Sequence, residues 1–373
     1  MQNQRLAQEK MRQIGDLFAI GGKFVSGEEI QTGLINTSVC LSYVEDDGVI
    51  RRYLIQRINE QVFPRPGDVM QNIKRVTRHV NDRVLRSKRD FSGQSLNLCP
   101  AKTGEVYAGG PNGGTWRCYR FIEGCRTYDQ VQNEHQAYQA AYAFGAFSDL
   151  LSDLDPTLIV ETIPDFHHTP KRYQQLVEAV ENDVAGRVKS VQPELEFLAS
   201  QREQLSRLVD MQAEGILPVR IVHNDTKINN VMINAETDEA VCVIDLDTVM
   251  PGVSLYDFGD MVRSAANETA EDDGCIENVG LSMPIFKAMV NGYLDACPSL
   301  TAEEINEMVF SVKLCALELC TRFLADYLNG DVYFKTTREH HNLDRARNQL
   351  RLAQCVDESS KEMQGVVKVR LAS

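Results

Sequence analysis

The segment HNDTKINN, at residues 223–230, places a histidine, an aspartate, a lysine and three asparagines between two apolar runs. The run before it is ILPV at 216–219, and the run after it is VMI at 231–233. Apolar runs of this kind are normally buried, and buried polar groups need hydrogen-bond or charge partners. The segment therefore predicts a polar loop held inside the fold.

A β-hairpin is predicted directly after this loop. The sequence VMIN is followed by the polar stretch AETDEA and then by VCVIDLD, so two apolar runs flank a short polar turn. A hairpin returns the chain to its starting point. We therefore expect Asp245 to lie close to Asp225 and Asn230, although it is distant from them in sequence.

Such a group of carboxylate and amide oxygens suits phosphoryl transfer. Carboxylates that lie together repel each other and lose hydration, so a cation normally compensates them. Oxygen ligands without cysteine or a histidine pair favour a hard cation such as Mg²⁺, which usually binds phosphates as well. A carboxylate left off the metal can accept a hydroxyl proton, which completes the parts of a phosphoryl-transfer site.

The same residues carry a family resemblance. The spacing His223-x-Asp225-x4-Asn230 resembles the catalytic loop of the kinase-like phosphotransferases, and Asp245 resembles their metal-binding aspartate. The chain is similar to the aminoglycoside phosphotransferase and choline kinase group. The blocks HNDTKINNV, VCVIDLDTVMPG, SLYDFGD, WRCYRFIE and RFLADYLNGDVYF look more narrowly like the N-acetylhexosamine 1-kinase subgroup. The resemblance extends from about residue 33 to 350, which is nearly the whole chain.

The resemblance implies a role for each residue of the central motif. Asp225 would position and deprotonate the attacking hydroxyl, while Asn230 and Asp245 would hold Mg²⁺ against the phosphates of ATP. His223 would brace the loop as a buried imidazole. Asp257 lies in a literal DFG triplet, but it follows a loop rather than a hairpin strand, so we expect it to brace the catalytic loop instead of binding metal.

Other polar residues near the motif are open to more than one interpretation. Lys227 could neutralise the transferring phosphoryl group or face solvent, and Asn229 is expected to hydrogen-bond within the loop. Asp247 lies two residues after Asp245, on the same face of an extended segment, so it could contribute to metal or acceptor binding. Arg263, just after the DFGD block, could also face the site.

The segment GLINTS, between two predicted strands, looks like a loop that covers phosphates. It begins with Gly33, and Asn36, Thr37 and Ser38 could supply hydrogen-bond donors. With a single glycine the pattern would be weak on its own. The assignment of this loop therefore depends on the family resemblance.

The strand at 53–57 departs from the family pattern. Kinase-like enzymes keep a phosphate-binding lysine there, but this chain has Gln56 with Arg57 beside it, and the following helix lacks the usual glutamate partner. How the α- and β-phosphates are held is therefore an open question. The connector YRFIE, with Phe121 and Ile122, is expected to present its backbone to the adenine.

The block RFLADYLNGDVYF supplies the candidates for acceptor binding. In the sugar-kinase subgroup an arginine and a tyrosine at this spacing contact the sugar, which implies Arg322 and Tyr333. Alternatively, Arg322 pairs along its helix with Glu318 or Asp326, and Tyr333 serves packing. The loop PDFHH at 164–168 is a further candidate on the acceptor side.

The periodicity predicts a two-lobed α+β fold, with a nucleotide-binding lobe at 1–122 and a catalytic, acceptor-binding lobe at 123–373. In the first lobe we expect strands within 20–63, with a hairpin turn at 45–48, a helix at 68–86, and strands at 104–108 and 115–122. In the second lobe we expect helices at 130–152, 171–189, 193–213, 302–328 and 342–356. Thr301 and Glu304 fit a capping box, and 357–373 is expected to be a partly ordered tail.

Composition excludes several classes of protein. No stretch has the length of a signal-peptide core or of a transmembrane helix. The net charge of −14 argues against general nucleic-acid binding, whereas residues 51–120 hold 14 Lys/Arg against 5 Asp/Glu and could attract an anionic ligand. The ten cysteines form no CxxC pair and are expected to be free thiols in the cytoplasm.

The function that these features predict is ATP- and Mg²⁺-dependent phosphorylation of a small hydroxyl acceptor. The anomeric hydroxyl of an N-acetylhexosamine is the expected target. Two alternatives stay open, namely a kinase of another sugar, an amino alcohol or an aminoglycoside, and a nucleotide-binding protein without activity. The sequence does not indicate the oligomeric state.

Overall fold

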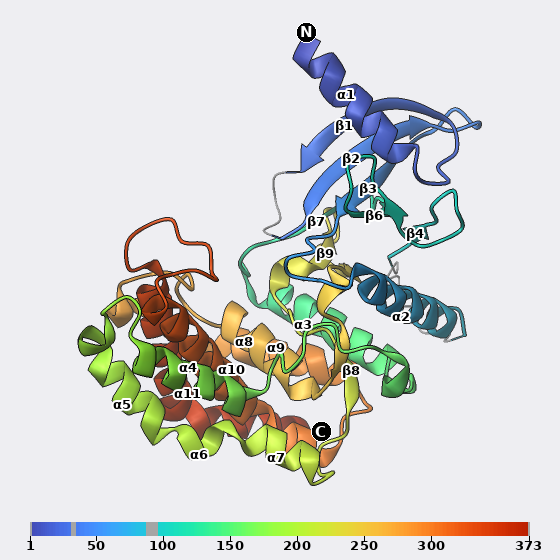
Figure 1. Cartoon of the computed structure of the whole chain (residues 1–373). Coiled ribbons are helices and arrows are strands. Elements are labelled where there is room, and N and C mark those ends of the chain that lie inside the picture. Colours follow the sequence, from blue (N-terminus) through green and yellow to red (C-terminus); the bar gives the residue numbers. More distant parts are fainter. Residues whose placement is uncertain (1, 31–34, 87–95, 372–373) are drawn as a thin grey trace.

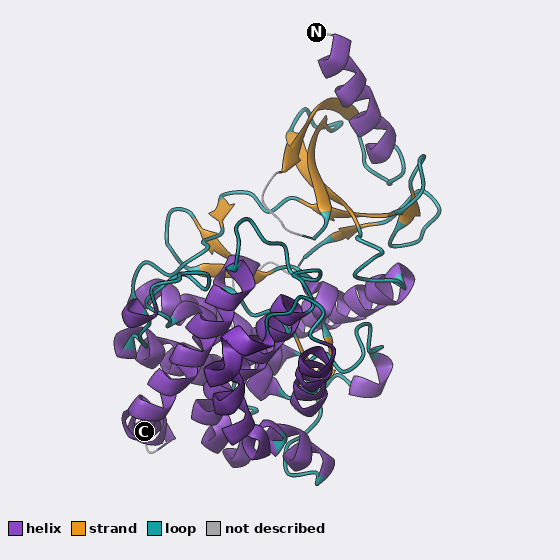
Figure 2. Cartoon of the chain, turned by 60° about the vertical axis from the view of Figure 1, so that its left-hand side comes forward, coloured by secondary structure: helices purple, strands orange, loops and turns teal. Residues whose placement is uncertain are grey.

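The computed structural model describes residues 2–30, 35–86 and 96–371. An antiparallel sheet forms the N-terminal part, and helices make up most of the C-terminal part (Figures 1 and 2). Together they are a mixed α+β fold, which confirms the predicted fold class.

In the described residues the N-terminal sheet has six antiparallel strands in the order β1-β2-β3-β6-β4, with β5 paired to β6. The strands are β1 (Lys23–Ile30), β2 (Thr37–Val44), β3 (Ile50–Arg57), β4 (Leu98–Cys99), β5 (Ala108–Gly109) and β6 (Thr115–Arg120). The predicted hairpin is confirmed, because β2 and β3 pair without a bulge. The strand predicted at 104–108 is wrong except at its last residue, because the chain turns at Gly104, whose φ is 87°.

The two faces of this sheet have different neighbours. One face packs with helix α1 (Gln2–Gly15) around a small core that includes Leu41 and Ile55. Because side chains alternate along each strand, Ser38, Gln56 and Arg117 form a cross-strand row on the other face. That face turns toward the helical part.

Helix α2 (Pro66–Arg86) follows the sheet, as expected for 68–86, and buries the apolar stripe Val69, Ile73, Val76 and Val80. These side chains belong to the large core that runs through the helical part, and α2 packs against α3 (Glu134–Leu150). The helix therefore joins the two parts of the molecule (Figure 1).

The remaining helices are α4 (Thr169–Asn182), α5 (Gln192–Ser200), α6 (Arg202–Leu205), α7 (Arg207–Ala213), α8 (Ser254–Ala265), α9 (Met283–Ala296), α10 (Ala302–Leu328) and α11 (His341–Leu371). The helix predicted at 171–189 ends early, where Asp183 adopts a left-handed φ of 37°. The helix predicted at 193–213 is three short helices instead of one.

Two features of the last helices are informative. Helix α10 begins with the predicted capping box, in which Thr301 and Glu304 exchange hydrogen bonds between side chain and backbone. The expected tail is wrong as far as Leu371, because α11 continues through it and buries Met363 and Val367.

Two small sheets support the polar segment at 223–230. They contain β7 (Cys125–Arg126), β9 (Val231–Asn234) and β10 (Ala240–Val243) in one sheet, and β8 (Arg220–Val222) and β11 (Met250–Gly252) in the other. The antiparallel pairing of β9 and β10 confirms the predicted hairpin.

Two of the expectations from composition concern the cysteines and the length of the apolar helices. All ten cysteines are free, and Cys275 is the exposed one. Among the described residues, no helix has both the length and the apolar character needed to span a membrane.

Candidate active site

Helix α8 holds the polar segment at 223–230 through the side chain of Asp257. The carboxylate of Asp257 accepts the backbone N–H of His223 at 2.8 Å and that of Asn224 at 2.7 Å. Asn224 has a left-handed φ of 65°, and its side chain donates to the carbonyl of Thr248 at 2.9 Å. The loop is therefore fixed by a buried carboxylate, whose pKa is raised by its burial in spite of the nearby His223.

The imidazole of His223 is fully buried and makes two hydrogen bonds. Its Nε2 lies 2.9 Å from the carbonyl oxygen of Ile244, and its Nδ1 accepts the N–H of Asp225 at 3.3 Å. In this arrangement Nε2 faces a carbonyl acceptor and Nδ1 faces a backbone donor. The rings of Phe144 and Phe147 enclose it edge-on. A ring used in this way braces the loop.

Asp225 contacts both a cation and an amide. Its Oδ1 lies 3.0 Å from the Nζ of Lys227, and its Oδ2 accepts the Nδ2 of Asn230 at 3.0 Å. Asp225 also raises the pKa of Lys227, more than any other neighbour does. Because Nδ2 of Asn230 is committed to Asp225, the Oδ1 of Asn230 is the atom left for a cation.

The hairpin brings Asp245 next to Asn230, as expected. Val243 pairs with Val231, and the N–H of Ile244 donates to the carbonyl of Asn230 at 2.9 Å. Asp245 itself adopts a left-handed φ of 58°, an uncommon conformation that aspartate tolerates better than most residues.

The charge of Asp245 is only partly compensated. The side chain has access to solvent, but protein crowds around its carboxylate, and this burial raises its pKa to about 6. The charges of Asp247 and Asp225 raise the pKa further, while Arg117 lowers it. The charged form of a carboxylate in this position is stabilised by a bound cation.

Asp245 and the Oδ1 of Asn230 fit a hard cation that has other ligands besides protein. Within the described ranges, no group of three or more His, Cys, Asp or Glu side chains is arranged to hold a metal. A cation here would thus use one or two side chains and complete its shell with phosphate or water, as Mg²⁺ usually does.

The contacts of Asp247 differ from the expected contacts with a metal or an acceptor. Its carboxylate is buried and forms a two-point ion pair with Arg117, and it also accepts the Nδ2 of Asn36 at 2.7 Å. Both of its oxygens therefore accept hydrogen bonds from the N-terminal part, from Arg117 on β6 and from Asn36 just before β2. Arg117 was missed by the sequence reasoning, although it lies in the quoted block WRCYRFIE.

The expected phosphate-covering residues separate into two groups. Ser38 and Asn36 reach the row that includes Gln56, because Ser38 accepts the Nε2 of Gln56 at 3.0 Å and Asn36 contacts Asp247. Thr37 and Arg57 pair with each other on the opposite face of the sheet and are exposed, so they do not share the site. Gly33 lies outside the described residues.

The connector between the two parts begins after β6. The N–H of Phe121 donates to the carbonyl of Arg52 at 3.0 Å, so this backbone group is already used within the sheet. The guanidinium of Arg52 lies over the Phe121 ring and pairs with Glu123, while Ile122 is buried in the large core. Backbone contact of the connector with adenine is still a prediction.

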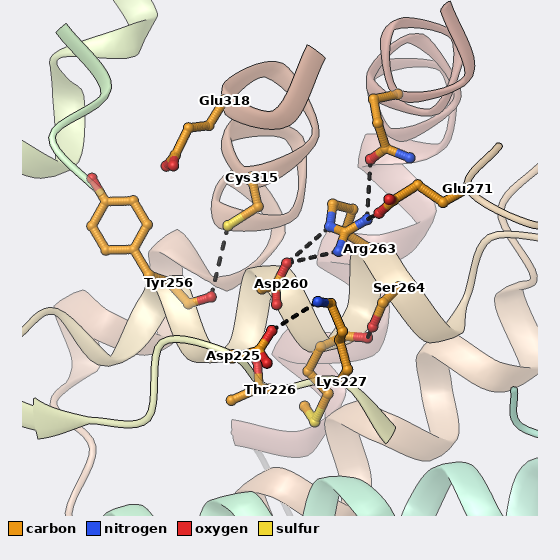
Figure 3. A network of polar contacts seen from close by, with 12 residues as sticks. Asp225, Thr226, Lys227, Tyr256, Asp260, Arg263, Ser264, Glu271, Cys315 and Glu318 are labelled. Carbon is orange, nitrogen blue, oxygen red and sulfur yellow. Dashed lines mark hydrogen bonds and ion pairs between the residues drawn. The ribbon is translucent and has the colours of Figure 1, made fainter. Parts of the chain in front are cut away.

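A buried ion-pair network lies beside Lys227 (Figure 3). Asp260 and Arg263, one turn apart on α8, pair at 2.9 Å, and Arg263 reaches Glu271 at 2.7 Å. Burial alone would raise the pKa of Asp260, but Arg263 and Lys227 outweigh it and leave that pKa lowered. Arg263 is thus a buried structural cation, which differs from the expectation that it faces the site.

Arg322, on helix α10, lies in a cluster with an acidic and two aromatic side chains. Its guanidinium is 3.6 Å from Glu318, close to the rings of Phe166 and Phe334, and the side chain is 14% exposed. The pairing with Glu318 was one of the two expected alternatives. It is too long for a hydrogen bond, so most of the N–H donors of Arg322 are available.

His167 links this cluster to α8. Its Nδ1 lies 2.9 Å from Glu318, its ring stacks on Tyr256 at 4.6 Å, and its buried Nε2 has no hydrogen-bond partner in the described structure. Burial alone would raise the pKa of Glu318, but His167 and Arg322 outweigh it and leave the pKa lowered. Tyr333 is 70% exposed, so it does not serve core packing.

The geometry can be compared with known proteins. A model of the phosphotransferase enzyme family matches residues 42–280, which is more than half of the chain. An aminoglycoside phosphotransferase from Alicyclobacillus acidocaldarius subsp. acidocaldarius is similar in structure, with a TM-score of 0.61 and 14% identity over 96% of each chain. The microcompartment-associated aminopropanol kinase has a TM-score of 0.58 and 16% identity, over 96% of this chain and 98% of that one.

A third solved structure, a choline kinase from Cryptosporidium parvum Iowa II, has a TM-score of 0.54 and 14% identity over 91% of each chain. At these identities the likeness concerns the fold, which is the protein-kinase-like arrangement of an antiparallel sheet and a helical part. The family match rests on the sequence itself. The chain belongs to the phosphotransferase enzyme family.

Proposed function

We propose that this phosphotransferase is an ATP- and Mg²⁺-dependent kinase of the anomeric hydroxyl of an N-acetylhexosamine. In this proposal residues 1–122 bind the nucleotide, and residues 123–373 provide the catalytic groups and bind the acceptor. The observation that carries the reaction class is the contact between Asp225 and Asn230, with Asp245 brought beside them by the hairpin. These are the groups that transfer of a phosphoryl group to a hydroxyl requires.

Each residue has a distinct task in the proposed reaction. Asp225 accepts the proton of the acceptor hydroxyl as the new oxygen–phosphorus bond forms, and the bond between the γ-phosphorus and the β-phosphate oxygen breaks to release ADP. Asn230 and Asp245 hold Mg²⁺, which supplies charge neutralisation on the phosphates. Lys227, 3.0 Å from Asp225, is placed to stabilise the transferring group.

The charged side chains around Arg322 support a neutral acceptor. Two guanidinium groups, Arg172 and Arg322, are close enough that Arg322 adds to the effect of burial in lowering the pKa of Arg172. Glu318, the nearby carboxylate, already faces His167 and Arg322. A cationic amino alcohol or aminoglycoside would find two cations and no uncommitted carboxylate in this cluster.

The same cluster has donors that suit the oxygens of a sugar. Arg322 offers N–H groups beside the rings of Phe166 and Phe334, and the buried Nε2 of His167 has no partner among the described residues. Sugars are commonly held by planar donors together with aromatic surfaces, because their oxygens accept hydrogen bonds and their C–H faces are apolar. The exposed Tyr333 could complete such a site.

The test is a panel of acceptors with Mg²⁺ and ATP. ADP release would be measured with N-acetylglucosamine, N-acetylgalactosamine, plain hexoses, choline and an aminoglycoside, and phosphorus NMR would locate the phosphate in the product. Turnover with an N-acetylhexosamine that gives an anomeric phosphate is the expected result. Turnover with only a cationic acceptor would contradict the proposed substrate and keep the reaction class.

A further inference from the structure

We propose that Arg117 is the protein cation that binds the α- and β-phosphates of the nucleotide, held in place by Asp247 and Gln56. The inference rests on the proposed nucleotide-dependent function and adds to it a residue of the sheet. It answers the question raised by strand β3, which carries Gln56 where related enzymes place a lysine.

The position of Arg117 follows from the register of the sheet. Arg117 on β6 is directly opposite Gln56 on β3, and Gln56 is directly opposite Ser38 on β2. The three side chains are joined, because Nε of Arg117 donates to Gln56 at 3.0 Å and Gln56 donates to Ser38 at 3.0 Å. Arg117 therefore lies on the strand next to that of Gln56, and its side chain is on the same face of the sheet.

The surroundings of Arg117 connect it with the metal-binding candidates. Its ion-pair partner Asp247 is two residues from Asp245, and the charge of Asp245 also acts on Arg117. The phosphates of a nucleotide whose Mg²⁺ is held by Asp245 must lie within a few ångströms of that metal. Arg117 is therefore on the side of the sheet where these phosphates would bind.

The hydrogen bonds of Arg117 leave capacity for a ligand. The guanidinium has five N–H donors, of which one goes to Gln56 and two to Asp247. The structure gives no protein partner within the described residues for the other two, although the side chain is only 1% exposed. A buried arginine with unused donors is stabilised by hydrogen bonds to an anion with several oxygens.

An arginine can bind a carboxylate and a phosphate at the same time better than a lysine can. Its planar fork can pair with a carboxylate along one edge and with a phosphate along another, whereas an ammonium acts as a single point charge. Asn36 holds Asp247 from the other side at 2.7 Å, so the carboxylate is fixed when it orients Arg117. Arg52, which shares this face of the sheet, is committed to Glu123 and Phe121 near the connector.

The experiment compares the binding of ADP and adenosine by calorimetry, without divalent cations, so that protein groups alone hold the phosphates. Arg117→Met is compared with wild type and with Arg51→Met, which removes the same charge from the surface of β3. We expect Arg117→Met to weaken ADP binding about 10- to 100-fold and to change adenosine binding less than about twofold. Arg51→Met should leave both affinities unchanged.

The outcomes separate the two proposals. If wild type binds neither adenosine nor ADP, and Mg²⁺ does not restore ADP binding, the nucleotide-dependent function is wrong and the inference falls with it. If folded Arg117→Met binds ADP as tightly as wild type does, the inference alone is wrong. Should Arg117→Met fail to fold, a crystal structure of wild type with ADP decides: Arg117 within about 3.2 Å of a phosphate oxygen supports the inference, and no such contact overturns it.

Discussion

The carboxylate of Asp257 accepts the backbone N–H of His223 at 2.8 Å, although the two residues are 34 positions apart. The same carboxylate accepts the N–H of Asn224, so both of its oxygens fix the start of the loop at 223–230. Helix α8 thereby determines where Asp225 points. This is the bracing contact expected for the aspartate of the DFG triplet, which here lies on a helix.

Replacement of Asp257 by Asn tests this brace. The amide retains one acceptor oxygen and turns an N–H₂ group toward a backbone N–H, so one buried donor loses its partner. We expect unfolding in urea to show a loss of about 1–3 kcal/mol, with reduced turnover. Asp155→Asn is the control, because Asp155 also accepts a backbone N–H, from Thr157, but at an exposed site. Equal losses in the two variants would contradict the brace.

Replacement of Asp225 by Asn tests the proposed base. The amide keeps the size of the side chain but cannot take a proton from the acceptor, so turnover should fall by about 100- to 10,000-fold. ATP binding, measured by calorimetry, should change little, because the remaining amide oxygen can still accept the Nδ2 of Asn230 and the sheet is untouched. An Asp225→Asn enzyme with unchanged turnover would show that another group is the base.

The raised pKa of Asp245 predicts the pH dependence of metal binding and of stability. The pKa is about 6 in the folded protein, above its ordinary value of 3.8, so the proton is held more tightly in the folded state. Protonation competes with Mg²⁺, so the affinity for Mg²⁺ should fall as the pH decreases through about 6. The stability that protonation gives is present below about pH 4 and is lost as the pH rises through 6.

Asp245→Asn separates these two effects. Without metal at pH 7, the variant should melt at a higher temperature than wild type, and the difference should disappear toward pH 4. Metal-dependent turnover should fall at least about 100-fold. Asp46→Asn, at an exposed turn, is the control and should show neither change. A pH-independent difference in melting temperature would rule out Asp245 as its source.

The ion pair of Asp260 and Arg263 gives a prediction about stability. Arg263→Met leaves Asp260 buried without its partner, which should cost about 3–5 kcal/mol of unfolding free energy. The double variant Asp260→Asn/Arg263→Met should be more stable than Arg263→Met, because the uncompensated charge is gone. Arg12→Met, which breaks exposed pairs on α1, should change the unfolding free energy far less than Arg263→Met does. Additive losses for Asp260 and Arg263 would mean that the pair is not coupled.

Local features of the site were predictable because they depend on short-range patterns. The alternation around AETDEA identified the hairpin, and the hairpin alone requires Asp245 to approach Asn230. The capping box at Thr301 likewise depends on residues three positions apart. Such signals need no knowledge of the rest of the fold.

The contacts between distant segments could not be predicted in this way. Arg117 and Asp247 are 130 positions apart, and only the packing of the sheet on the helical part brings them together. Strand alternation does indicate that Arg57 and Gln56 face opposite sides, and this signal was not used. Helix α1 was missed because its sequence, QNQRLAQEKMRQIG, is polar and has only a narrow apolar stripe, which includes Met11.

Arg322→Met tests the acceptor site. If Arg322 donates hydrogen bonds to the sugar, its loss should raise the KM for the acceptor about 10- to 100-fold and leave the KM for ATP unchanged. Arg322→Lys should recover only part of the affinity, because an ammonium cannot supply planar donors between the rings of Phe166 and Phe334. Arg351→Met, which removes a partly exposed arginine on α11, should change neither KM. An unchanged acceptor KM in folded Arg322→Met would mean that Arg322 serves only its pairing with Glu318 and its ring contacts.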